Sequence, residues 1–169
     1  MTPTVLLDDS GIQEHVQRLG REIARDHPGG VVLVGVLKGA LIFLADLARA
    51  VPDIDVTVDF ISISRFAPDS GRVKILHDLA CDIGGRDVVL VEDIVDTGLT
   101  MRYLLDNLAT RRPESVRIAA LLEKPARAQV KIPIDYRGFV IGDEFVVGYG
   151  LDWDGKLRNL PYVGVPRVK

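Results

Sequence analysis

Residues 88–100, Val88-Val89-Leu90-Val91-Glu92-Asp93-Ile94-Val95-Asp96-Thr97-Gly98-Leu99-Thr100, join an apolar run to three acids and a threonine–glycine turn. The apolar run predicts a strand over Asp87–Glu92 that is buried on both faces, as in parallel sheets. A loop over Asp93–Gly98 and a helix over Leu99–Ala109 follow. Free N–H groups at a helix start bind phosphate, and adjacent carboxylates bind ribose hydroxyls or Mg²⁺. The segment therefore predicts a site for a phosphorylated ligand.

The rest of the chain alternates strands and helices around this segment. Apolar residues at helical spacing predict a helix over Gly11–Asp26, which Ser10 caps with Gln13 three residues further on. Strands are predicted over Val31–Val36, Asp55–Ser64, Val73–Leu76, Val116–Glu123, Gly138–Ile141 and Val146–Tyr149, with a further helix over Ala40–Val51 and loops over Leu37–Gly39 and Arg65–Arg72. This order predicts an α/β fold with a mainly parallel sheet flanked by helices.

In such sheets, ligands bind beyond the carboxyl ends of the strands. Two predicted loops lie there, Leu37-Lys38-Gly39 and Asp93–Gly98, so we expect both to contribute to one site. The 169 residues and the lack of an interdomain linker indicate a single domain over residues 1–169.

The composition narrows the classes of function. Hydrophobic residues make up 47% and charged residues 27%, as in ordinary globular domains. The net charge of −3 argues against general nucleic-acid binding and a membrane partner is not indicated. The single cysteine, Cys81, cannot form an intramolecular disulfide and is interpreted as a small buried side chain. The N-terminus does not have the pattern of a signal peptide, so we expect a cytoplasmic protein.

These residues together resemble a known family. Residues 88–100 are similar to the phosphoribosyl pyrophosphate (PRPP) motif of type I phosphoribosyltransferases, and the chain as a whole resembles bacterial hypoxanthine-guanine phosphoribosyltransferases. The matching stretches lie in the same order along the chain: residues 34–39, 60–64, 91–100, 121–125, 143–152 and 158–162. The resemblance implies a core of about residues 10–135 and a small hood, or lid region, formed by the N-terminus and residues 136–169.

The resemblance also implies a reaction of purine salvage. The 5-phosphoribosyl group passes from PRPP to N9 of a 6-oxopurine through an oxocarbenium-like transition state. Hypoxanthine gives IMP and guanine gives GMP, with pyrophosphate as the other product, Mg²⁺ as cofactor and a homodimer or homotetramer as the assembly.

The implied site residues divide by ligand. Asp96 is the expected general base at purine N7, although an aspartate at that position could also cap the helix. Glu92 and Asp93 hold the ribose and, with Asp152, Mg²⁺. Lys124 donates to the 6-oxo group, Phe145 stacks on the base, and Val146 and Asp152 adjoin it. The expected PRPP contacts are Lys38 and Gly39, where the family often has a cis peptide bond at Leu37–Lys38, together with Glu92, Asp93, Asp96, Thr97, Gly98, Leu99, Thr100 and Arg158.

One departure from the family and three other readings stay open. The family usually has Ser-Tyr in the mobile loop where this chain has Arg65-Phe66, so the resemblance does not imply which contact this lid makes. A preference for xanthine is possible. A PRPP-sensing regulator that binds nucleic acid is disfavoured by Asp96, by Leu37-Lys38-Gly39 and by the acidic balance. A generic dinucleotide or P-loop domain is disfavoured because neither glycine motif is present.

Overall fold

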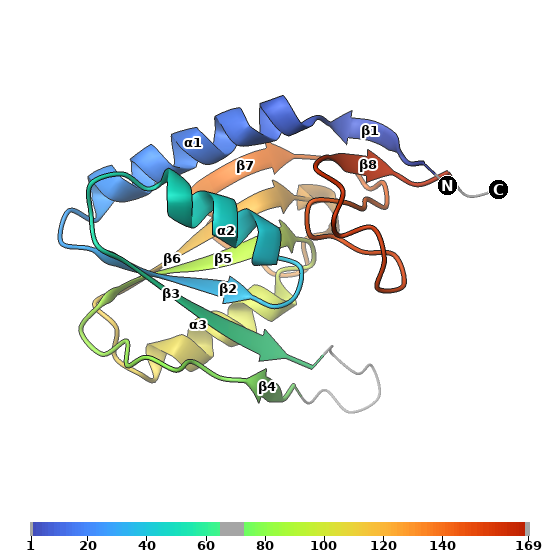
Figure 1. The fold of residues 1–169 in the computed structure, drawn as a ribbon. Helices are drawn as coiled ribbons and strands as arrows, with labels where there is room; N and C mark the ends of the chain where they lie inside the picture. The colour runs from blue at the N-terminus through green and yellow to red at the C-terminus, as the bar shows by residue number, and fades with distance from the viewer. Residues whose placement is uncertain (1, 65–72, 168–169) are drawn as a thin grey trace.

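The computed structural model describes residues 2–64 and 73–167 (Figure 1). The predicted loop Arg65–Arg72, with Arg65-Phe66, lies outside the described residues. The elements in chain order are β1 (Thr4–Leu7), α1 (Asp9–Asp26), β2 (Val31–Val36), α2 (Leu41–Ala50), β3 (Val56–Ile63), β4 (Ile75–His77), β5 (Asp87–Val95), α3 (Leu99–Ala109), β6 (Ser115–Glu123), the 3₁₀ turn η1 (Pro125–Arg127), β7 (Tyr136–Val140) and β8 (Val163–Val165).

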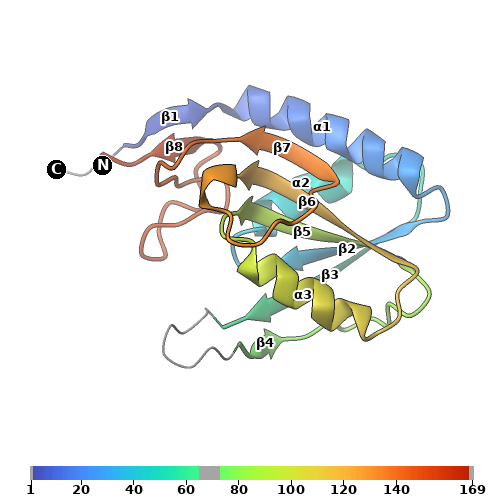
Figure 2. The same ribbon diagram turned by 180° about the vertical axis from the view of Figure 1, so that it is seen from behind.

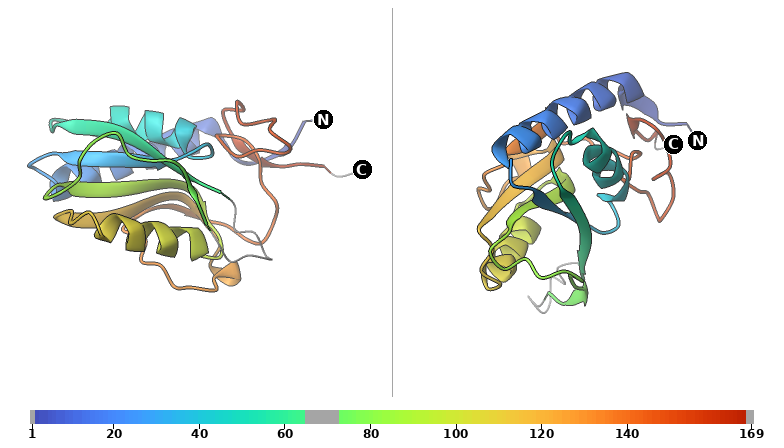
Figure 3. Two further views of the ribbon diagram at one scale, coloured as in Figure 1. Left: turned by 90° about the horizontal axis from the view of Figure 1, so that it is seen from below. Right: turned by 60° about the vertical axis from the view of Figure 1, so that its left-hand side comes forward.

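A six-stranded sheet with the order β4-β3-β2-β5-β6-β7 forms the centre of the molecule. All neighbouring pairs are parallel except β3 and β4. Helices α1 and α2 cover one face and α3 covers the other (Figures 2 and 3). The predicted fold class, a mainly parallel sheet flanked by helices, is confirmed.

Strand β5 shows why its sequence is apolar without a break. Val89 and Val91 pack into the core under α1 and α2, whereas Val88 and Leu90 pack into the core under α3. Both faces of this central strand are therefore excluded from water, which requires apolar side chains at successive positions. All four side chains are completely buried.

Helix α1 begins two residues before the predicted Gly11. Asp8 is its N-cap, with extended backbone angles, and its carboxylate accepts a hydrogen bond of 2.8 Å from the amide of Gly11. The hydroxyl of Ser10 donates to the same carboxylate at 3.1 Å. The prediction of a Ser10 cap is wrong because a better acceptor stands two residues earlier.

The two ends of the chain form an antiparallel ribbon that the sequence analysis missed. Strand β1 pairs with β8, so residues about 160 positions apart in sequence lie side by side (Figure 1). The predicted strand Val146–Tyr149 is not formed: Val147 makes one bridge to Gly164, and the chain then turns back through Gly148–Leu151. Whether such a short segment forms a strand depends on a partner segment far away in the sequence, and the local sequence pattern does not specify that partner.

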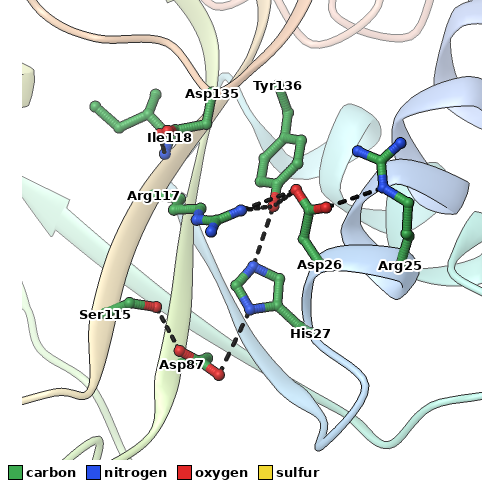
Figure 4. Close-up of polar contacts among 9 residues, drawn as sticks. All are labelled: Arg25, Asp26, His27, Asp87, Ser115, Arg117, Ile118, Asp135 and Tyr136. Carbon is green, nitrogen blue, oxygen red and sulfur yellow. Dashed lines mark hydrogen bonds and ion pairs between the residues drawn. The ribbon is translucent and has the colours of Figure 1, made fainter.

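At the amino ends of β5 and β7, a polar network anchors the end of α1 (Figure 4). The buried His27 ring lies 3.1 Å from the hydroxyl of Tyr136 and 3.5 Å from Asp87. Tyr136 donates to Asp26 at 3.0 Å, and Arg117 bonds both groups. Burial raises the pKa of Tyr136 to about 12, so its phenol keeps the proton that it donates. The network joins α1 to the amino ends of β5 and β7, far from the predicted site.

Across residues 2–64 and 73–167, no helix combines the length and apolar character that a membrane crossing requires.

Candidate active site

Two adjacent carboxylates, Glu92 and Asp93, lie in the carboxyl-terminal half of the central strand β5. Strand β5 runs to Val95, three residues beyond the prediction, because β6 pairs with it as far as Glu123. Glu92 is 7% exposed, and burial and the neighbouring Asp93 raise its pKa well above the usual value. Burial also raises the pKa of Asp93, although the amide of Ile94 donates to its carboxylate at 2.7 Å. Both acids are thus held in a place that calls for a cationic or hydroxyl-bearing ligand.

The loop after β2 packs directly on these acids. The Leu37–Lys38 peptide bond is cis, as the resemblance implies. A methyl carbon on Gly39 would lie 1.7 Å from a carboxylate oxygen of Asp93, so only glycine fits. Gly150, at φ +101°, packs on the carbonyl of Gly39 from the other side. The sequence analysis missed Gly150, although Gly148-Tyr149-Gly150 was a signal of close backbone approach.

A cavity of about 300 Å³ opens beside this loop, and it brings predicted residues from four segments together. Arg158 adds a second cation to Lys38: it donates to the carbonyl of Gly150 at 2.6 Å and pairs with Asp152 at 2.9 Å. The cavity is lined by Val36, Leu37, Lys38, Gly39, Ile63, Ser64, Glu92, Asp93, Thr100, Asp152 and Arg158.

The N-terminus of α3 forms the next part of the site. Gly98 is its N-cap at φ 84°, and a side chain there would meet the carbonyl of Val130 at 2.4 Å. The carbonyl of Thr97 accepts from the amides of Gln129 and Val130 at 2.9 and 3.0 Å. Thr97, Gly98 and Thr100 line a second cavity of about 110 Å³ with Glu92 and Asp93, and Leu99 supplies the first helical residue.

Asp96 does not cap α3, so that interpretation is wrong. Gly98 holds the cap position, and the carboxylate of Asp96 instead accepts from Arg127 at 2.6 Å. Arg127 also donates to Asp143 at 3.2 Å, and these bonds raise its pKa above the usual value. The sequence analysis missed Arg127 because nothing in the pattern distinguishes it from other exposed arginines.

Of the predicted base-binding residues, Lys124 lines the same cavity as Asp96. Lys124, only 7% exposed, follows β6, and its amide bonds to the carbonyl of Val95 at 2.9 Å. Its ammonium donates to the carbonyl of Glu144 at 2.7 Å. Phe145 is 56% exposed and meets Trp153 edge to face at 6.2 Å, whereas Val146 is buried. An aromatic ring this exposed is free to stack on a ligand.

A third cavity, of about 650 Å³, contains both the expected general base, Asp96, and the expected donor to the purine, Lys124. It is lined by Asp96 and Lys124 together with Val95, Glu123, Pro125, Arg137 and residues 128–134. Phe145 and Val146 line none of the three cavities described here, so their place beside the base rests on the Lys124–Glu144 hydrogen bond.

The carboxylates fit Mg²⁺ only in company with a ligand. Glu92, Asp93 and Asp152 line the same cavity, and carboxylate oxygen is the donor that Mg²⁺ prefers. Within the described part of the chain, however, no three acidic, histidine or cysteine side chains converge on one point. Mg²⁺ usually binds one or two carboxylates plus substrate phosphates, and this donor set suits that mode.

Comparison with known proteins shows the family of the chain. The sequence pattern of the phosphoribosyl transferase domain matches residues 5–154. The chain therefore belongs to the phosphoribosyltransferase family.

The most similar relatives define the group within that family. The hypoxanthine-guanine phosphoribosyltransferase of Mycobacterium avium is 46% identical over 98% of this chain and 87% of that protein. The crystal structure of a hypoxanthine-guanine phosphoribosyltransferase from Bacillus anthracis superimposes with a TM-score of 0.94 at 40% identity, over 99% of this chain and 100% of that one. Hypoxanthine phosphoribosyltransferase from Trypanosoma cruzi, solved with the product IMP, has a TM-score of 0.91 at 37% identity, over 96% and 93%.

Within that family, the chain belongs to the hypoxanthine-guanine phosphoribosyltransferases. The chain also matches the bifunctional TilS/HprT protein of Listeria monocytogenes at 45% identity, and it spans 25% of that protein's length.

Proposed function

We propose that the protein transfers the 5-phosphoribosyl group of PRPP to N9 of a 6-oxopurine and releases pyrophosphate. Hypoxanthine gives IMP and guanine gives GMP, a reaction of purine salvage. The observation that carries this proposal is the continuous row of groups along one sheet edge. Two cations line one cavity with two buried carboxylates, and the same carboxylates line the next cavity with the N-terminus of α3. That second cavity shares Val95 and Asp96 with the cavity that contains the buried Lys124. These groups suit the pyrophosphate, the ribose, the 5′-phosphate and the base.

PRPP occupies the two cavities at the ends of β2 and β5. Its 5′-phosphate meets the free amides of α3 and the hydroxyls of Thr97 and Thr100. The carboxylates of Glu92 and Asp93 accept hydrogen bonds from the ribose hydroxyls. Lys38 and Arg158 attract the pyrophosphate.

The proposed metal site lies in the cavity of about 300 Å³ that Lys38 and Arg158 also line. Glu92, Asp93 and Asp152 would hold Mg²⁺ together with oxygens of PRPP, and the ion would offset the charge of the departing pyrophosphate. The side chains have the other roles: Glu92 and Asp93 orient the ribose, and Lys38 and Arg158 hold the pyrophosphate.

The base lies between Lys124 and Phe145. Lys124 donates to its 6-oxo oxygen, the backbone of Val146 meets its edge, and the ring of Phe145 covers its face. N9 bonds to the anomeric carbon while the bond from that carbon to pyrophosphate breaks. The proton leaves N7 for the carboxylate of Asp96, which restores a neutral purine.

A base panel tests the proposal. We expect IMP from hypoxanthine with PRPP and Mg²⁺, slower or similar turnover of guanine and little of adenine. Turnover of xanthine alone would establish the xanthine-preferring alternative. Binding of PRPP and of RNA or DNA without turnover of any base would show that the protein is a PRPP-sensing regulator and not an enzyme.

The assembly and the location are part of the same proposal. We place the enzyme in the cytoplasm, in keeping with its single cysteine. We keep as its hood the N-terminus and residues 136–169, except β7, which pairs with β6 in the central sheet. Leu41 of α2 and Val58 of β3 expose apolar side chains, which a second copy would cover in a homodimer or homotetramer. Light scattering of the purified protein measures its molar mass and so tests whether it is a dimer or a tetramer.

A further inference from the structure

Arg127 connects two loops of the site that carry different parts of the reaction. It ends the turn η1, three residues after Lys124. Its Nε donates to Oδ1 of Asp96 at 2.6 Å, and its Nη1 donates to Oδ1 of Asp143 at 3.2 Å. Asp96 belongs to the loop before α3, and Asp143 stands two residues before Phe145. One guanidinium thus joins the proposed general base to the segment that carries the base-stacking ring.

The fold does not need this side chain. Backbone hydrogen bonds from Gln129 and Val130 to the carbonyl of Thr97 already hold the loop of Asp96 against the segment after η1, and Lys124 donates to the carbonyl of Glu144 in the segment of Asp143. The turn η1 has its own bonds, from the amide of Arg127 to Lys124 and from Ala128 to Pro125. The arginine is about half exposed, and ion pairs between exposed side chains contribute little to stability because water and salt screen them.

The geometry leaves one oxygen of Asp96 available. Across residues 2–64 and 73–167, hydrogen bonds reach only Oδ1 of this carboxylate, so Oδ2 is free to meet a proton on the purine. A guanidinium has a planar fork of donors in fixed directions, so it sets the orientation of a carboxylate more strictly than an ammonium does.

We infer that Arg127 is a positioning residue: it aims the carboxylate of Asp96 at the purine and fixes the loop of Phe145 relative to it. The inference rests on the proposed function, in which Asp96 takes the proton from the base. It assigns to Arg127 no contact with substrate, so its effect has to pass through Asp96 and Asp143.

A double-mutant cycle tests the inference on the full chain, with hypoxanthine, PRPP and Mg²⁺. We expect Arg127→Ala to lower kcat by about 10- to 100-fold, as for a misplaced catalytic group, and to change the KM for PRPP much less. In an Asp96→Asn background the same substitution should change kcat by less than about twofold, because no general base remains to be aimed. Arg127→Lys should restore only part of kcat.

Two controls separate aim from folding. Arg102 forms a comparable pair with Asp106 on α3, and its side chain is 45% exposed against 47% for Arg127. Arg102→Ala should leave kcat and the melting temperature unchanged. Asp143→Asn, which removes the charge of the second partner, should raise the KM for hypoxanthine more than it lowers kcat.

The outcomes are distinct. Loss of kcat in Asp96→Asn with an unchanged kcat in Arg127→Ala overturns the inference and leaves the proposed function intact. Equal losses from Arg127→Ala in both backgrounds also overturn it, because the effect would then bypass Asp96. A near wild-type kcat in Asp96→Asn overturns both the inference and the role of Asp96 in the proposed function.

Discussion

Gly39 offers the sharpest test of how the site is built. Its α-carbon lies against the carboxylate of Asp93, and replacement by alanine adds one methyl group at that contact. The substitution changes no charge and removes no hydrogen-bonding group. Any loss of function therefore comes from displaced atoms alone.

The size of the displacement follows from the contact distances. The new carbon would lie 1.7 Å from Oδ2, 2.6 Å from Cγ and 3.1 Å from Oδ1 of Asp93, whereas ordinary contact begins at 3.4 Å. Oδ2 must therefore retreat by about 1.7 Å, or the loop must move by as much. The carboxylate is buried and bonded to the amide of Ile94, so it has little room to turn.

Steady-state kinetics with varied PRPP measure the consequence. A shift of about 1 Å in a catalytic group costs about 100-fold, so we expect kcat/KM for PRPP to fall by about that factor. Overpacking costs about 1–3 kcal/mol, which lowers the melting temperature by several degrees. Gly29→Ala is the matched control, because a methyl group there meets nothing within 4 Å, and it should behave as wild type.

One result refutes this reasoning. If Gly39→Ala keeps kcat/KM for PRPP within about threefold of wild type, Asp93 is not needed where the structure places it. A melting temperature that falls equally in Gly39→Ala and Gly29→Ala would show a general effect of alanine instead.

Three further expectations follow from the same site. Lys124→Gln should narrow the gap between hypoxanthine and adenine, because glutamine can accept from the adenine amino group, and wild-type turnover of adenine equal to that of hypoxanthine would contradict the role of Lys124. Excess chelator should abolish activity and added Mg²⁺ should restore it, since the carboxylates and the pyrophosphate repel one another, whereas full activity in chelator removes the metal from the reaction. Glu92→Gln should raise the ligand-free melting temperature while weakening PRPP binding. Burial raises the pKa of Glu92 in the folded state, so the contribution of this one group to stability is greatest below its unfolded pKa near 4.5 and declines as pH rises. The stabilisation by Gln relative to wild type should therefore grow with pH, and a difference that shrinks above pH 5 contradicts this account.

The strand–loop–helix of residues 87–109 shows how much local sequence determines. Its apolar run predicted a buried parallel strand, and its acids and glycine predicted a phosphorylated ligand beyond the end of that strand. The structure confirms the strand, extends it to Val95 and places Glu92 and Asp93 beside the N-terminus of α3. Local patterns suffice here because side-chain periodicity and turn chemistry act over a few residues.

Contacts between segments that are far apart in the sequence became visible only in the tertiary structure. Asp96 stood where an aspartate often caps a helix, but Gly98 caps α3 and Asp96 turns to Arg127, 31 residues away. The ribbon of β1 and β8, and the packing of Gly150 on Gly39, likewise join segments more than 100 residues apart. Sequence alone determined the central strands, the sheet type and the acids at the carboxyl end of β5, because each is set by neighbours along the chain. Only the folded molecule could choose the partners of those acids, because that choice depends on which distant groups the packed core brings within hydrogen-bonding distance.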